Sequence, residues 1–81
     1  MKKHQSALNV GDLVMFKPEG TYGKWFGGKF AKVTHCSYGS DGKYHCRVKW
    51  LNPVLYFDRF ATVSDFGQDN FILCSDNGKS S

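Results

Sequence analysis

Glycine and proline residues recur so often in this chain that short strands are favoured over helices. They stand at positions 11, 18, 20, 23, 27, 28, 39, 42, 53, 67 and 78 of the 81 residues. Both residue types disrupt helices, and the intervals between them suit β-strands. No window of about 11 or more residues shows the apolar spacing of an amphipathic helix. The sequence therefore predicts an all-β fold.

Five segments between these breakers have the length and composition of short antiparallel strands. The pair Asp41-Gly42 favours a two-residue type I′ turn, so the second and third segments should form a hairpin. A four-residue turn would shift the paired residues but keep the same faces. Asn52-Pro53 should end the third strand, and residues 54–59 fit a loop, a helical turn or an extended edge. A long loop, residues 18–29, follows the first strand. The five segments are Asp12 to Lys17, Phe30 to Tyr38, Lys43 to Leu51, Phe60 to Phe66 and Asn70 to Cys74.

Alternation along the hairpin predicts one apolar face and one basic face. Strand residues point alternately to the two sides of a sheet, and directly paired residues share a side. The apolar face, directed at the core, should contain Ala31, Val33, His35, Ser37, Cys46, Val48 and Trp50. The solvated face should contain Lys32, Thr34, Cys36, His45, Arg47 and Lys49.

The pairs His35-Cys36 and His45-Cys46 suggest a zinc site, which needs converging ligands. Neighbouring strand residues point to opposite faces, so these side chains should not converge, and a Cys36–Cys46 disulfide should fail for the same reason. We therefore expect no metal and no cofactor. His35 should be half-buried, and Cys46 and Cys74 should be buried thiols. An odd cysteine count without an apolar export signal favours reduced thiols and a cytoplasmic location.

No motif for catalysis is recognisable. The sequence contains neither a Gly-rich phosphate loop followed by Lys-Ser/Thr nor a Gly-x-Ser-x-Gly nucleophile elbow. A Cys36–His45 pair on an open sheet face would lack a pocket and an oxyanion hole. No apolar run reaches the roughly 18–20 residues of a membrane helix. We therefore expect a protein that is not an enzyme, with neither a membrane nor a small-molecule substrate among its partners.

The charged residues are unevenly distributed along the chain, whose net charge is +4. Residues 1–50 carry nine basic and three acidic side chains, whereas residues 51–81 carry two basic and four acidic ones. Such an asymmetry can steer an anionic partner to one side of the molecule. The alternative is that the charges only keep the surface solvated.

The order of these elements resembles that of SH3-like small β-barrels, the group that includes KOW and Tudor domains. The resemblance rests on residues 10–16, a strand that Gly11-Asp12 opens, on the long loop, on the Asp41-Gly42 turn and on Val48-Lys49-Trp50. It covers residues 9–74, which should form one barrel domain between flexible tails at 1–8 and 75–81. The compact chain also resembles many small bacteriophage proteins.

One short motif resembles the Asp-Tyr-Gly-Asn signature of Tudor domains. It is Asp65-Phe66-Gly67-Gln68. In that family the signature directly follows the central strand, whereas residues 51–64 intervene here. This departure argues against a cage for a methylated ligand.

The resemblance implies a binding module, and the residues favour RNA or DNA as its partner. The basic strand face would neutralise phosphates, and the loop aromatics would stack on bases. Alternatively, these aromatics and Phe26 fold onto an open barrel end, or the same loop is the hot spot of a protein-docking module, such as a small effector of a host protein. The predicted interface comprises Tyr22, Lys24, Trp25, Lys29, Lys32, His45, Arg47 and Lys49.

Overall fold

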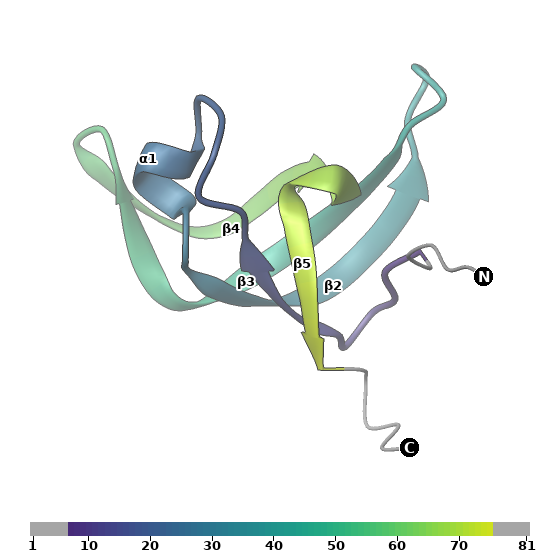
Figure 1. Ribbon diagram of the computed structural model, residues 1–81, viewed down its shortest axis with the longest axis horizontal. Helices are drawn as coiled ribbons and strands as arrows, with labels where there is room; N and C mark the ends of the chain where they lie inside the picture. Colours follow the sequence, from purple (N-terminus) through teal and green to yellow (C-terminus); the bar gives the residue numbers. More distant parts are fainter. Residues whose placement is uncertain (1–6, 76–81) are drawn as a thin grey trace.

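The computed structural model describes residues 7–75, which form five antiparallel strands in one strongly curved sheet (Figure 1). Across the sheet their order is β4-β3-β2-β1-β5, so the last strand returns to pair with the first. The predicted all-β class with five antiparallel strands is confirmed. The sheet is open, with β4 and β5 as its two edges. In chain order the strands are β1 (Leu13–Phe16), β2 (Phe30–Tyr38), β3 (Tyr44–Tyr56), β4 (Arg59–Gly67) and β5 (Phe71–Ser75).

Two short helical segments interrupt the strands. The single-turn helix α1 (Gly23–Phe26) lies in the long loop after β1, and the 3₁₀ turn η1 (Gln68–Asn70) precedes β5. A side chain at Gly27, directly after α1, would collide with the backbone of Gly23 and Pro18. Glycine is therefore required where the loop closes on itself. Neither helical segment within residues 7–75 is long and apolar enough to cross a membrane.

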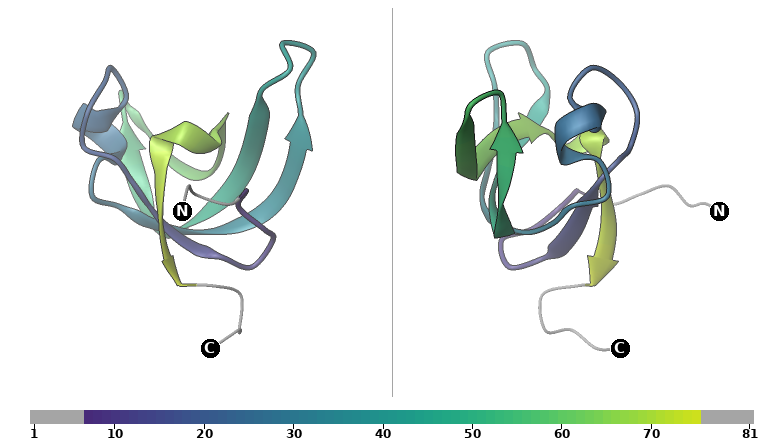
Figure 2. Two further views of the ribbon diagram at one scale, coloured as in Figure 1. Left: turned by 45° about the vertical axis from the view of Figure 1, so that its right-hand side comes forward. Right: turned by 90° about the vertical axis from the view of Figure 1, so that its left-hand side faces the viewer.

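The inner, concave face of the sheet supplies the core. The β2–β3 and β3–β4 hairpins rise at opposite ends of this face, with α1 beside the β3–β4 hairpin (Figures 1 and 2). Phe26 of α1 stacks on Trp50 with ring centroids 4.9 Å apart. Leu8 is fully buried, although its position falls in the predicted tail 1–8. The remaining parts of the predicted tails, residues 1–6 and 76–81, lie outside the described residues. The other buried residues of the core are Val14, Phe16, Ala31, Val33, Cys46, Val48, Val54 and Phe71.

The alternation predicted for the β2–β3 hairpin holds up to Val33 and then fails. Val33 lies opposite Val48, but the next paired residue of β2 is His35, opposite Arg47. Thr34 is thus the extra residue of a β-bulge, and its Oγ1 donates to the carbonyl oxygen of Arg47 at 3.2 Å. Because side chains alternate with a period of two, one extra residue reverses the faces of every later residue in the strand.

This reversal corrects several predictions. Cys36 faces inward, directly opposite Cys46, and their Sγ atoms lie 3.5 Å apart, so the argument that kept them apart is wrong. His35 faces outward and is exposed instead of half-buried. Cys74, which lies on β5 and is unaffected by the bulge, is also exposed instead of buried. Among residues 7–75, no three His, Cys, Asp or Glu side chains gather where they could hold a metal ion.

The predicted turn of this hairpin is also wrong in type. Tyr38 pairs with Tyr44, so residues 39–43 form the loop. Gly42 alone in that loop has a positive φ, 79°, whereas a type I′ turn needs positive φ at both central residues. The loop is stabilised by the backbone N–H of Lys43, which donates to Asp41 Oδ1 at 2.9 Å.

Strand β3 does not end at Asn52-Pro53 as predicted. Its register with β4 shifts between Lys49 and Val54, and the strand bends there and continues to Tyr56. Pro53 is tolerated because it lies in the shifted stretch, where no ladder hydrogen bond is required of it. A two-residue turn, Phe57-Asp58, then leads into β4.

Candidate nucleic-acid interface

The outer, convex face of the sheet carries the cations predicted for β2 and β3. Lys32 of β2 lies directly opposite Lys49 of β3, and both side chains are exposed. Leu13 of β1 and Val63 of β4 flank them in the same row of the sheet. Within residues 7–75, neither lysine forms an ion pair with an acidic side chain. Two like charges therefore lie side by side on an open surface.

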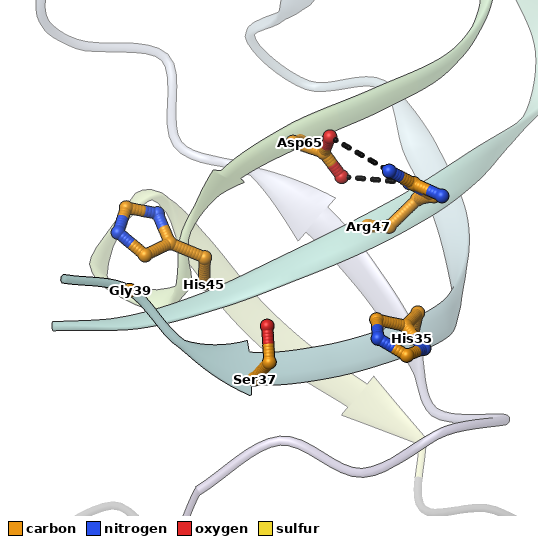
Figure 3. A pocket seen from close by; sticks show the side chains of 6 residues that line it. All are labelled: His35, Ser37, Gly39, His45, Arg47 and Asp65. Atoms are coloured by element: carbon orange, nitrogen blue, oxygen red, sulfur yellow. Dashed lines mark hydrogen bonds and ion pairs between the residues drawn. The ribbon is translucent and has the colours of Figure 1, made fainter.

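Arg47 lies in the next row of the outer face and is paired with Asp65 of β4. Its Nε lies 2.9 Å from Asp65 Oδ1 and its Nη2 lies 3.3 Å from Oδ2 (Figure 3). The hydrogen bond and the charge of Asp65 raise the pKa of Arg47. Both side chains are more than half exposed, at 54% and 58%, so the pair stabilises the fold little. Its main effect is to offset part of the positive charge of this face.

A shallow polar cavity of about 380 Å³ lies beside this ion pair. One wall is His45, whose Nε2 lies 3.4 Å from Asp41 Oδ1. The backbone N–H of Lys43, followed by His45, lowers the pKa of Asp41. Regular alternation predicts that His35 faces the core, but the bulge at Thr34 places it on this surface instead. The cavity is lined by His35, Ser37, Gly39, His45, Arg47 and Asp65 (Figure 3).

The predicted loop aromatics do not join the outer face. Trp25 packs edge-on against Tyr56 with ring centroids 4.9 Å apart, and Tyr22 packs against Phe66 at 5.3 Å. Trp25 is half-buried, while Tyr22 remains 43% exposed. The Nζ atom of Lys24 lies 4.7 Å from the Trp25 ring centroid, a cation–π contact. These aromatics cover the inner side of the sheet beside the β3–β4 hairpin.

The eight predicted interface residues thus fall into three places. Lys32, His45, Arg47 and Lys49 share the outer face, while Tyr22, Lys24 and Trp25 gather around α1. Lys29 lies between these groups, directly before β2. The third loop aromatic, Phe26, is buried in the core. This agrees with the alternative prediction that the loop aromatics fold onto the core.

The β3–β4 hairpin carries exposed apolar side chains that were not assigned from the sequence. Leu55, Phe57 and Phe60 are 53%, 66% and 66% exposed. Phe57 has a φ of 59°, which is rare for a bulky side chain, and its ring centroid lies 4.9 Å from that of Trp25. Burial, followed by the nearby Tyr22, raises the pKa of Tyr56 in the same cluster. The aromatic density of residues 56–60 was the available signal, but without a turn position it gave no geometry.

No protein-family model, no curated protein and no solved structure matches the chain. Any functional assignment therefore rests on the arrangement of the described residues.

Proposed function

We propose that this chain is a non-catalytic module that binds RNA or DNA through the outer face of its sheet. The observation that carries the proposal is the directly opposed, exposed pair Lys32 and Lys49. Like charges at opposed positions of neighbouring strands destabilise a sheet. A phosphate group between them would remove that repulsion and release condensed counterions from the nucleic acid.

The surroundings of the lysine pair support an extended anionic ligand over a single small anion. Arg47 follows Lys49 on the same face of β3, and the polar cavity beyond it adds the imidazoles of His35 and His45. Cationic side chains and imidazoles therefore continue along the outer face from Lys32 toward the turn between β2 and β3. Asp65 offsets part of this positive charge without removing it, because among residues 7–75 its ion pair is with Arg47 and with neither lysine.

The proposal includes an SH3-like barrel that is left open between β4 and β5. The first strand lies between β2 and β5, a long loop follows it, and a 3₁₀ turn precedes the last strand. These features support the resemblance that the sequence suggested. The proposal also places the protein in the cytoplasm, where the free thiols of Cys36, Cys46 and Cys74 would stay reduced.

Charge reversal on the outer face tests the proposal. We expect short fluorescent RNA and DNA oligonucleotides to bind at low salt, and Lys49→Glu to abolish the binding. Because each phosphate contact contributes about −0.7 to −0.9 to the slope of log Kobs against log salt, contacts from both lysines predict a slope of about −1.4 to −1.8. Asp65→Asn should strengthen binding, because it frees Arg47 from its partner.

The matched control is Arg59→Glu, which changes the net charge equally but lies at the β3–β4 hairpin. Fluorescence anisotropy should show nearly unchanged affinity for this variant. Equal loss of affinity in the Arg59 and Lys49 variants would mean that only net charge matters, and the outer face would not be the interface. Unchanged thermal unfolding of each variant would show that the fold is intact.

A protein-docking module, such as a small bacteriophage-type effector of a host protein, is the second candidate. The observation that favours it is the exposed apolar tip formed by Leu55, Phe57 and Phe60. Exposed aromatic side chains of this kind are enriched in hot spots. Such a partner should stay bound at moderate salt and be lost on Phe57→Ser, whereas Lys49→Glu should leave it bound.

A further inference from the structure

A second, smaller cavity on the outer face lies beside the lysine row. It has a volume of about 130 Å³ and is lined by Gly28, Lys29, Phe30, Leu51 and Asn52. Phe30 precedes Lys32 by two residues on β2, so the two side chains share the outer face, roughly 7 Å apart along the strand. The cavity therefore adjoins the proposed phosphate-binding pair.

The Phe30 ring faces outward and has no ring partner within the part of the chain that the structure describes. Its side chain is 44% exposed, and it contacts no other aromatic ring among residues 7–75. Met15 of β1 lies opposite it in the sheet and supports it from one side. The pairing with β1 thus holds one ring in place for a planar ligand.

The rim of the cavity adds space, charge and hydrogen-bonding groups. Gly28 has a φ of 78°, and a side chain placed there would meet nothing within 4 Å, so this edge is open. Lys29 contributes a cation, and it forms no ion pair within the described part of the chain. The Asn52 amide makes no hydrogen bond to any other residue in 7–75, so both its donor and its acceptor are available to a ligand.

We propose that this cavity holds one unpaired base of a single-stranded nucleic acid. The base would stack on Phe30 while Asn52 reads its edge, and Lys29, Lys32 and Lys49 would contact the flanking phosphates. Stacking on protein aromatics requires a base that is not already stacked within a helix. Duplex presents phosphates to the lysines but no free base face to Phe30. The inference rests on the proposed function and narrows its ligand to single strands.

Competition between single-stranded and duplex oligonucleotides of the same sequence tests the inference. We expect the single strand to bind more tightly. Phe30→Leu should weaken single-strand binding roughly 5- to 150-fold, the range of one lost base–aromatic stack, and leave duplex binding unchanged. Leucine keeps an apolar side chain against Met15, so thermal unfolding should be nearly unaltered. Phe60→Leu, at another exposed aromatic residue on the β3–β4 hairpin, is the matched control and should bind as the parent protein does.

The outcomes separate this inference from the proposed function. Equal affinity for single strand and duplex, or an unaltered affinity of Phe30→Leu, would overturn the base site. Continued sensitivity to Lys49→Glu would then leave the lysine face in place as a phosphate binder. Absence of binding to either oligonucleotide at low salt would overturn both and favour the protein-docking candidate. An equal loss in Phe60→Leu would also count against the base site.

Discussion

The three cysteines of this chain differ in how far solvent reaches their thiols. Cys46 is fully buried on the inner face, Cys36 beside it is partly buried, and Cys74 on β5 is exposed. Burial, followed by the hydrogen bond with Cys36, raises the pKa of Cys46 to about 12. Alkylating reagents attack the thiolate, so Cys46 is protected both by packing and by its proton.

We expect iodoacetamide at about pH 8 to label Cys74 first, Cys36 more slowly and Cys46 only after unfolding. A pKa of about 12 leaves roughly one thiolate in 10⁴ at Cys46 under these conditions. Peptide mass spectrometry over a time course measures the three rates separately. In urea all three thiols should react at comparable rates. Labelling of Cys46 as fast as that of Cys74 in the native protein would contradict its burial.

At the scale of elements, hydrophobic alternation predicted the β2–β3 hairpin and both of its faces as far as Val33. It failed beyond Thr34 because a bulge adds one residue without a sequence signal. Threonine is a good strand former, and no glycine or proline marks the position. The end of β3 was mispredicted for a related reason. Pro53 breaks a regular ladder, but the bend of β3 places it where no ladder bond is needed.

Within the candidate site, the facing of the residues on regular strands was predicted correctly and that of the residues in the irregular loop was not. Lys32, Arg47 and Lys49 were correctly placed on one face, because the bulge changes the facing of β2 only beyond Val33 and leaves that of β3 unaltered. The aromatics of residues 22–26 lie in a loop, where no periodicity fixes direction, and packing against β3 and β4 decided where they went. The cavity proposed to hold a base was missed because Phe30 and Leu51 become neighbours only through the register of the sheet.

Deletion of Thr34 tests the bulge. Thr34 and His35 both face outward, so removing one leaves a regular strand in which Cys36 still faces Cys46. We expect the free energy of unfolding to fall by only about 1 kcal/mol, the value of the lost hydrogen bond to Arg47. Chemical denaturation measures this change, and Cys46 should remain protected from alkylation.

Deletion of Lys32 is the control for that experiment, because Lys32 lies in the regular part of β2. Deleting Lys32 reverses the facing of every residue on one side of the deletion. Either Ala31 or Val33 must therefore leave the core. We expect this variant to unfold or to lose protection at Cys46. Equal damage from the two deletions would show that β2 has no bulge at Thr34.

For the molecule as a whole, an open sheet must cover its inner face with segments that are not strands. Helix α1 covers the end near the β3–β4 hairpin, where Phe26 stacks on Trp50. The segment before β1 covers the other end, where Leu8 is fully buried. A chain of this length buries only about 60–65% of its unfolded surface, so each covering side chain is a sizeable part of the core.

Leu8 is held by its backbone as well as by its side chain. Its N–H donates to Gln68 Oε1 at 3.0 Å, and its carbonyl oxygen accepts from Tyr44 Oη at 3.1 Å and from Cys36 Sγ at 3.5 Å. These contacts join the N-terminal segment to η1 and to the β2–β3 hairpin at once. The segment before β1 therefore covers the end of the inner face that lies away from α1.

Leu8→Ala should consequently destabilise the domain by about 2–5 kcal/mol, the range for leucine truncation in a packed core. Val10→Ala is the matched control, because Val10 lies in the same segment but is 53% exposed, and its free energy of unfolding should change little. Urea denaturation of the two variants measures the difference directly. If residues up to 8 were only a tail, both substitutions would be equally harmless. A large loss confined to Leu8→Ala would mean that the core extends beyond the sheet to the residues that precede its first strand.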